Sequence, residues 1–395
     1  MSRKLYKLAK KAMILVYRLI CVCLPVKKCR IVFDSGVGKS YAGNPRAIYE
    51  YMVSQGLDEK WECIWFYEKT PYPIPGACMQ VPMKRFRYLY YMATAGVWIF
   101  DSRQPQFLKR RENTLYIQTW HGTPLKKLAL DLDDVFMSGE TGIETYKKSF
   151  AENVRTWDYL ISQNPYSTEI FRRAFDFHGE MLEIGYPRND VLFHGNTPEH
   201  IRNLKKKLGL PEDKKILLYA PTWRDDEFSD ANGYQFRPEL SFDDMMSALD
   251  GEYVMIVKYH YLIMDAVDWT PYENFVYTFD QSRDIAELFL VADGLITDYS
   301  SVMFDYSILK RPMYFFAYDL EKYRDELRGF YFDYEAEMPG PVCKTTTQLI
   351  NSIRTYESAD YQERYLAFGK KYNGRDDGTA CEKICGLVRC NIERK

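Results

Sequence analysis

Residues 115–128 read LYIQTWHGTPLKKL, and this stretch decides the kind of fold that we expect. Residues 115–120 carry no charge and are rich in residues that favour β-structure, which predicts a buried strand. Gly122, Thr123 and Pro124 then predict a turn that opens a helix. His121 therefore lies at the carboxyl end of a strand, where open α/β sheets bind their ligands. A turn histidine that only caps the next helix is the competing interpretation.

Strand-like and helix-like runs alternate on both sides of this stretch, which predicts an α/β fold with mostly parallel sheets. The strand-like runs cover residues 30–33, 96–100, 159–162 and 181–184 in the first half, and they start at residues 216, 253, 275 and 294 in the second half. Helical segments are expected between them, at residues 45–55, 242–248, 285–291 and 302–310.

A chain of 395 residues is long for one core, so we predict two domains. The polar, lysine-rich residues 196–214 are the best boundary. The prediction is a basic amphipathic segment over 1–28, a first Rossmann-like domain over 29–196, and a second over 197–395 that ends in helices.

Composition excludes several classes of protein. Hydrophobic residues make up 46% and charged residues 27%, as in a folded domain. The nine cysteines form no paired CxxC blocks, which argues against a disulfide framework and a structural zinc site and indicates a reducing cytosol. No basic aromatic patch is present, so nucleic acid is not an expected partner.

The amino-terminal segment differs from the rest of the chain in charge. Residues 1–30 hold nine basic residues and no acid, whereas the whole chain has a net charge of −2. The apolar run 12–26 is interrupted by Arg18 and is shorter than the roughly 20 residues that span a bilayer. Lysines at helical spacing beside an apolar row predict an interfacial helix. We therefore expect residues 1–28 to bind an anionic membrane surface at the cytoplasmic face. A first helix docked on its own domain is the alternative.

Further candidate side chains follow strands in the second half. Arg224 can bind a phosphate through its planar donors, and Lys258, Tyr259 and His260 end the next strand. Ser300 and Ser301 begin a predicted helix, whose amino terminus suits a pyrophosphate. Asp305, on its first turns, can accept from a ribose or polyol hydroxyl. The alternatives are a surface arginine paired with Asp225 or Asp226 and serines that serve only as helix caps.

The phosphate-loop interpretation fails, and a metal site is the less favoured interpretation of the acidic runs. The run SGVGKS at residues 35–40 lacks the glycine that a phosphate loop needs at position 33, where Phe33 stands. The acids at residues 131–134 and 224–230 look like solvated loop acids, so we predict no metal ion and no cofactor.

The motifs WHGTPLK (120–126), GYPRND (185–190), YAPTWRDD (219–226), KYH (258–260) and TDYSSVMFDY (297–306) together resemble the CDP-glycerol glycerophosphotransferases of wall teichoic acid synthesis. This resemblance implies a glycosyltransferase B fold, with two Rossmann-like domains facing an interdomain cleft. The first domain would face the acceptor and the second would bind CDP-glycerol. The family's two essential histidines fall on His121 and His260. Its substrate contacts fall on Gly122, Thr123, Pro124, Leu125, Arg224, Lys258, Tyr259, Ser300, Ser301 and Asp305. Many members carry Arg-x-His-Pro where this chain has Lys258, Tyr259, His260 and Tyr261.

The resemblance also implies a reaction, the transfer of glycerol phosphate from CDP-glycerol to a hydroxyl, with release of CMP. The acceptor would be a polyprenyl-diphosphate-linked saccharide or a teichoic acid at the membrane. His121 is the favoured general base and His260 the alternative, since neutral histidine suits that role near pH 7. Without a large extra amino-terminal domain, a primase-like enzyme that adds one or few units is expected. The alternatives are a CDP-ribitol or capsule polyol-phosphate transferase, a nucleotide-sugar transferase of the same fold, and a non-catalytic membrane-associated binding protein.

Overall fold

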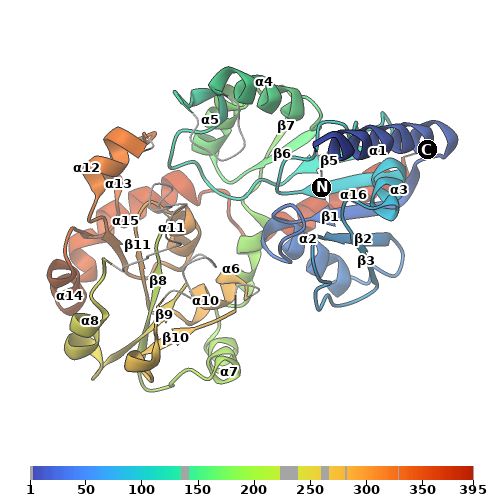
Figure 1. Cartoon of the computed structure of the whole chain (residues 1–395). Helices are drawn as coiled ribbons and strands as arrows, with labels where there is room; N and C mark the ends of the chain where they lie inside the picture. The colour runs from blue at the N-terminus through green and yellow to red at the C-terminus, as the bar shows by residue number, and fades with distance from the viewer. Residues whose placement is uncertain are drawn as a thin grey trace. The chain divides into compact units, whose positions relative to one another are not determined.

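The structure, a computed structural model, describes residues 3–134, 142–222, 239–258, 267–280, 283–327 and 329–394. These residues form two compact units, each built on a parallel β-sheet (Figure 1). Unit 1 comprises Met1–His121, Leu128–Asp190 and Arg375–Lys395, and unit 2 comprises Gly122–Lys127 and Val191–Gly374. The predicted α/β class with parallel sheets is therefore confirmed.

Unit 1 contains a sheet of order β3-β2-β1-β4-β5-β6-β7. Its strands are β1 (Lys27–Asp34), β2 (Glu62–Tyr67), β3 (Cys78–Pro82), β4 (Ala95–Phe100), β5 (Leu115–Gln118), β6 (Tyr159–Ser162) and β7 (Glu180–Glu183). Its helices are α1 (Arg3–Cys23), α2 (Gly43–Ser54), α3 (Phe86–Thr94), α4 (Ile143–Val154), α5 (Pro165–Ala174) and α16 (Ala380–Glu393). The predicted strand at residues 115–120 is present as β5, although it ends at Gln118.

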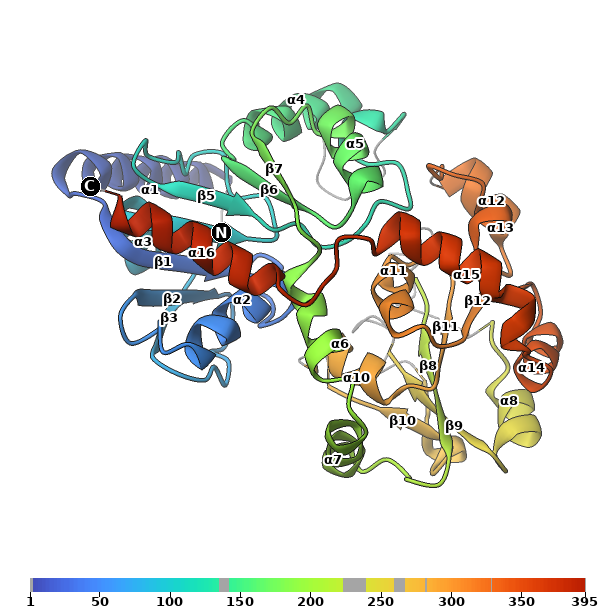
Figure 2. The same ribbon diagram turned by 180° about the vertical axis from the view of Figure 1, so that it is seen from behind.

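Helices cover both faces of the unit 1 sheet, which explains why its central strands are apolar without alternation. Ile31 and Phe33 of β1 pack in one core cluster with Tyr49 of α2 and Val388 of α16. Helices α1 and α3 lie on the opposite face, as the two views in Figures 1 and 2 show. Both helix layers therefore contribute to the burial of β1.

Unit 2 contains a sheet of order β10-β9-β8-β11-β12-β13. Its strands are β8 (Lys215–Ala220), β9 (Tyr253–Val257), β10 (Val276–Thr278), β11 (Gly294–Thr297), β12 (Met313–Phe316) and β13 (Val342–Cys343). Its helices include α7 (Pro198–Leu208), α8 (Phe242–Leu249), α10 (Ile285–Val291), α11 (Val302–Tyr306), α12 (Leu320–Lys322), α13 (Tyr334–Glu337), α14 (Thr346–Arg354) and α15 (Ser358–Tyr372), and the short α6 (Asp190–His194) begins at the last residue of a unit 1 segment.

The two sheets share one strand order. Counted along the chain within each unit, both begin 3-2-1-4-5-6, the order of the doubly wound dinucleotide-binding fold. The order reverses between β1 and β4 in unit 1 and between β8 and β11 in unit 2. Ligands of such sheets bind at the carboxyl ends of the strands beside this switch point.

The units differ from the predicted boundaries, and residues 122–127, predicted in the first domain, belong to unit 2. The predicted division at residue 196 lies instead at Asp190, and residues 375–395 return to unit 1. The return is explained by α16, whose Ile384 and Val388 are buried in the unit 1 core. Asp190 also accepts hydrogen bonds from the backbone N–H groups of Ala380 (3.2 Å) and Cys381 (2.7 Å). No local pattern marks a helix that packs against strands more than 300 residues earlier.

Helix α1 docks on unit 1 by one side. Tyr17 is buried, and its hydroxyl donates to the carbonyl of Lys109 at 2.7 Å. On the same helix, Leu15, Leu19 and Val22 expose 59%, 54% and 85% of their surface. Among the described residues, no helix is long and apolar enough to cross a bilayer. The helix thus combines a docked side with an exposed apolar row.

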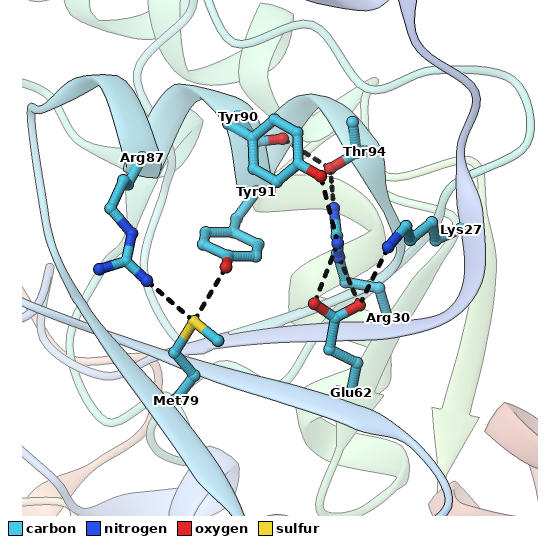
Figure 3. Close-up of polar contacts among 8 residues, drawn as sticks. All are labelled: Lys27, Arg30, Glu62, Met79, Arg87, Tyr90, Tyr91 and Thr94. Atoms are coloured by element: carbon cyan, nitrogen blue, oxygen red, sulfur yellow. Dashed lines mark hydrogen bonds and ion pairs between the residues drawn. The ribbon is translucent and has the colours of Figure 1, made fainter.

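A buried ion pair lies at the amino-terminal edge of the unit 1 sheet (Figure 3). The Arg30 side chain is 2% exposed, and its Nε and Nη2 atoms each lie 2.9 Å from a carboxylate oxygen of Glu62. Its guanidinium also donates to the Thr94 hydroxyl and lies 4.9 and 4.8 Å from the ring centres of Tyr90 and Tyr91. This cluster joins β1, β2 and α3.

We expect Arg30→Ala to lower the free energy of unfolding by about 3 kcal/mol, because it leaves a partly buried carboxylate and the Thr94 hydroxyl without their partner. Lys27→Ala is the matched control, since Lys27 faces the same Glu62 at 3.9 Å but is 53% exposed. It should cost less than about 1 kcal/mol. Urea unfolding of both variants checks this, and equal losses would contradict the assignment.

Candidate functional site

At the unit 1 switch point, the carboxylate of Asp101 binds the loop that follows β1. Asp101 itself follows β4 and is 6% exposed. One oxygen accepts from the Ser35 hydroxyl at 2.6 Å, and the other accepts from the Gly36 N–H at 2.9 Å. The loop after β1 is therefore fixed to the end of β4, across the point where the strand order reverses.

A second carboxylate, Asp34, binds the same loop from inside the unit. Asp34 is fully buried and accepts from the Gly38 N–H and from the Gln104 side chain at 3.1 Å. Burial, with the nearby negative charge of Asp101, raises the pKa of Asp34 to about 7. Since aspartates take up the N–H groups of Gly36 and Gly38, the glycine-rich run is a carboxylate-bound turn. This agrees with the failure of the phosphate-loop pattern.

His121 lies beside this turn, with its side chain exposed. Its Nδ1 is 3.0 Å from the backbone carbonyl of Asp101. A carbonyl can only accept, so Nδ1 carries a hydrogen, and in the neutral ring Nε2 then has the free lone pair. The imidazole stacks on Trp120 with 4.3 Å between ring centres. This arrangement suits a general base. The competing interpretation, a histidine that caps the next helix, is excluded because residues 122–127 form no helix.

The helix that we predicted after Pro124 is absent. Residues 122–127 belong to unit 2, where backbone bonds join them to residues 329–331. The Leu125 carbonyl accepts from the Tyr331 N–H at 3.1 Å, and the Lys127 N–H donates to the Gly329 carbonyl at 2.9 Å. These bonds use backbone groups that a helix would need. The prediction was wrong because this pairing is invisible in the local sequence.

Gly122 lies against Ser301 within unit 2. A Cβ atom at position 122 would lie 2.7 Å from the Ser301 Oγ and 3.2 Å from its Cβ, closer than side chains normally pack. Thr123 and Leu125 are each 3% exposed. The structure therefore brings two predicted substrate-binding elements, residues 122–125 and the Ser300–Ser301 pair, into contact.

The unit 2 switch point repeats the arrangement of unit 1. Asp298 follows β11 and is 2% exposed, and one of its oxygens accepts from the N–H groups of Thr222 (2.7 Å) and Tyr299 (2.6 Å). Its backbone carbonyl accepts from the Tyr334 hydroxyl at 2.8 Å. Asp298 thus fixes the position from which Ser300 and Ser301 follow.

Helix α11 is shorter than predicted. It ends at Tyr306 and continues as a 3₁₀ turn to Leu309, instead of running as one α-helix over residues 302–310. The Ser301 side chain makes no capping hydrogen bond, while the Ser300 hydroxyl accepts weakly from Val302 N–H at 3.5 Å. The capping interpretation therefore fails for Ser301. Asp305 is only 3% exposed.

Lys258 follows β9, and its ammonium lies 3.3 Å from the backbone carbonyls of Asp280 and Arg283. Burial lowers the pKa of Lys258. The predicted residues Arg224, Tyr259 and His260 lie outside the described residues. Within the described part of the chain, no three His, Cys, Asp or Glu side chains are grouped to hold a metal ion.

Sequence reasoning missed the residues that hold the candidate side chains in place, which are Asp101, Asp298 and Asn44. The available signal was the position of an aspartate directly after the fourth strand of each unit.

Both units have the strand order of dinucleotide-binding folds. A histidine lies beside one switch point and serine hydroxyls lie beside the other. These features define an α/β protein of two units, each with candidate ligand-binding groups at the carboxyl ends of its strands. The same fold is found at 10% identity and a TM-score of 0.53 in a putative UDP-N-acetylglucosamine 2-epimerase from Listeria monocytogenes. That likeness concerns the fold alone.

Residues 16–389 match the model of the family described as CDP-Glycerol:Poly(glycerophosphate) glycerophosphotransferase. The teichoic acid poly(glycerol phosphate) polymerase of Bacillus spizizenii is 43% identical over 94% of this chain and 94% of its own length. Its counterpart in Bacillus subtilis is 43% identical over 98% of this chain, which spans about half (52%) of that longer protein. A solved structure of the wall teichoic acid polymerase TagF has a TM-score of 0.91 and 41% identity, covering 99% of this chain and 96% of that one. The chain belongs to this family of transferases.

The relatives also bear on the expected primase-like activity. The teichoic acid glycerol-phosphate primase of Bacillus subtilis is 29% identical over 78% of this chain, well below the value for the polymerases. The comparison therefore does not support the expectation of a primase.

We expect Asp34→Asn to remove one component of the pH dependence of stability. A carboxyl whose pKa is raised from 3.8 to about 7 on folding stabilises the native state fully below pH 4, and this contribution is lost as pH rises to 7. The free energy of unfolding of wild type should therefore fall by a few kcal/mol more than that of the variant between pH 5 and 8. Urea titrations measure this, with Asp250→Asn, at a carboxylate 56% exposed, as control. Parallel pH profiles for wild type and Asp34→Asn would contradict the raised pKa.

We also expect Gly122→Ala to displace the Ser301 hydroxyl, since both groups cannot occupy their present positions. The variant should raise the KM for the donor about as much as Ser301→Ala does, and the double variant should add little. Gly251→Ala is the control, because no atom lies within 4 Å of a Cβ there. Steady-state kinetics decide this, and additive losses would show that the two positions act independently.

Proposed function

We propose that this chain transfers glycerol phosphate from CDP-glycerol to a hydroxyl of a membrane lipid-linked saccharide or teichoic acid chain, with release of CMP. The choice of glycerol over ribitol rests on the sequence identity between this chain and its named relatives. Proteins named for glycerol phosphate polymerases or transferases are 41–44% identical, above those named for ribitol phosphate at 30% and the glycerol-phosphate primases at 28–29%. A histidine-to-asparagine variant of TagF soaked with CDPG supports the same donor.

In this proposal the units have separate roles within a glycosyltransferase B architecture. Unit 1, with His121, provides the acceptor side, and unit 2, with residues 122–125, Lys258, Ser300, Ser301 and Asp305, binds CDP-glycerol. Arg224, Tyr259 and His260 complete the donor site. The contact between Gly122 and Ser301 supports one continuous donor-binding surface within unit 2.

The chemistry is an attack of the acceptor oxygen on the phosphorus that bears glycerol. A new P–O bond forms, the bond from that phosphorus to the bridging oxygen of CMP breaks, and the acceptor proton passes to Nε2 of His121. The Nδ1–H bond to the Asp101 carbonyl stabilises the resulting imidazolium. The Ser301 hydroxyl, Arg224 and His260 offset charge on the leaving phosphate, and the proposed reaction requires no metal or cofactor.

The proposal favours extension of a polymer over priming, following the identities to named polymerases and primases. It also includes peripheral association with the cytoplasmic face of the membrane. The apolar row of Leu15, Leu19 and Val22, next to the basic residues of the same segment, supports that association.

His121→Ala should lower kcat by about 10²–10⁴, because it removes the positioned base, while the KM for CDP-glycerol changes little. CMP release with CDP-glycerol and a lipid-linked acceptor measures both constants. His178→Ala is the matched control, since its side chain is 80% exposed and pairs with Asp176 nearby. A His121→Ala enzyme that keeps wild-type kcat would show that another residue is the base.

A further inference from the structure

Asn44 connects three backbone groups at the end of β5 and in the loop of residues 185–190. Its side-chain Nδ2 donates to the carbonyls of Thr119 (3.1 Å) and Trp120 (3.0 Å). Its Oδ1 accepts from the backbone N–H of Arg188 at 3.2 Å. The guanidinium of Arg188 in turn donates to the His121 carbonyl at 2.8 Å.

We propose that Asn44, acting with Arg188, is the positioning residue that holds His121 in its reactive orientation. This inference rests on the proposed role of His121 as the base.

The contacts account for nearly the whole polar backbone of residues 119–121. The Thr119 N–H donates to the Phe100 carbonyl at 2.8 Å, and the Trp120 N–H donates to the Gln118 side chain at 3.0 Å. The three carbonyls of this segment lie beyond the last residue of β5, so strand pairing does not satisfy them. Asn44 and Arg188 donate to these three carbonyls, and the Thr119 hydroxyl also donates to the Trp120 carbonyl at 3.2 Å. Because Asn44 is 1% exposed, water does not readily replace it.

The backbone that Asn44 holds is in an unfavourable conformation. Trp120 has φ of 51°, in the left-handed region that residues with a Cβ rarely adopt. This conformation places the His121 ring on the indole and its Nδ1 beside the Asp101 carbonyl. Without the bonds from Asn44, Trp120 has a lower-energy conformation available to it. The ring of His121 would then leave the carbonyl that fixes its tautomer.

An amide side chain suits this position, because an amide both donates and accepts. It must donate twice and accept once, and Asn44 does all three from the first turn of α2. The loop of Arg188 is itself fixed, since Asp376 accepts from the Tyr186 N–H (3.1 Å) and from the Asn189 side chain (3.2 Å). The Arg188 guanidinium also lies 4.9 Å from the Tyr186 ring centre. The loop that binds the His121 carbonyl through Arg188 is thus itself held by hydrogen bonds to Asp376.

The test is Asn44→Asp in the full-length chain, which keeps the shape but replaces both donors by an oxygen facing two carbonyls. We expect kcat to fall 10- to 100-fold, with the KM for CDP-glycerol within twofold of wild type. Asn153→Asp is the matched control, because Asn153 is also buried and donates to a backbone carbonyl, that of Gln104, at 2.6 Å. It should keep wild-type kcat at a comparable loss of thermal stability.

Two further measurements separate positioning from a general structural role. In a His121→Ala background, Asn44→Asp should cause no additional loss of kcat, because the group that it positions is gone. Nitrogen-15 spectra of the five histidines should show the His121 ring with Nδ1 protonated in wild type and as a mixture of tautomers in Asn44→Asp. Arg188→Met, expected to lower kcat about 3- to 30-fold, provides the same test if Asn44→Asp does not fold.

The outcomes distinguish this inference from the proposed function. If His121→Ala is inactive while Asn44→Asp and Arg188→Met keep wild-type kcat, the positioning role is overturned and the base assignment stands. If His121→Ala keeps wild-type kcat, the base assignment itself fails. A loss in Asn44→Asp that is matched by Asn153→Asp, or that persists in the His121→Ala background, also overturns the positioning role.

Discussion

In each unit, an aspartate that directly follows the fourth strand binds the loop that follows the first strand. Asp101 accepts from Ser35 and Gly36 in unit 1, and Asp298 accepts from the Thr222 N–H in unit 2. These bonds join the two sides of the switch point, where the strand order reverses. They lie beyond the carboxyl ends of the strands, so the backbone pairing of the sheet does not hold these loops together. Each aspartate is almost fully buried, so its charge is stabilised by these donors. The candidate side chains depend on this constraint, because the Asp101 carbonyl orients His121 and Asp298 fixes the start of the Ser300–Ser301 turn.

The central strands and the α/β class could be predicted because burial on both faces leaves continuous apolar runs in the sequence. Runs such as GVWIF at residues 96–100 have no other plausible role. Strands β2, β3, β12 and β13 were not predicted. Strand β3 lies at a sheet edge, is half-exposed and ends in Pro82. Strands β2 and β12 are buried apolar runs, so their pattern was present in the sequence and was missed. The helix after Pro124 was predicted and is absent, since residues 122–127 bind residues 329–331 instead. The position of α16 was missed for the same reason, a pairing between distant segments.

In the candidate site, too, residues with a local sequence signal could be predicted, and residues that act through distant contacts could not. His121 could be recognised from its place after a strand, and Ser301 from its place before a helix. The groups that orient them could not, because Asn44 and Thr119 are 75 residues apart and Arg188 and Asn44 are 144 residues apart. Folding brings these residues together through the sheet order, and a single sequence does not display such pairs. Residues that perform chemistry thus carry a local signal, whereas residues that position them do not.

We propose that His121 and the hydroxyls of unit 2 serve a transfer of glycerol phosphate. The most direct measurement follows the purified chain with CDP-glycerol and a short lipid-linked acceptor, counting released CMP by chromatography and acceptor units by mass spectrometry. We expect one glycerol phosphate to be added for each CMP released. CMP release without growth of the acceptor, or transfer of a sugar from a nucleotide sugar in its place, would contradict it.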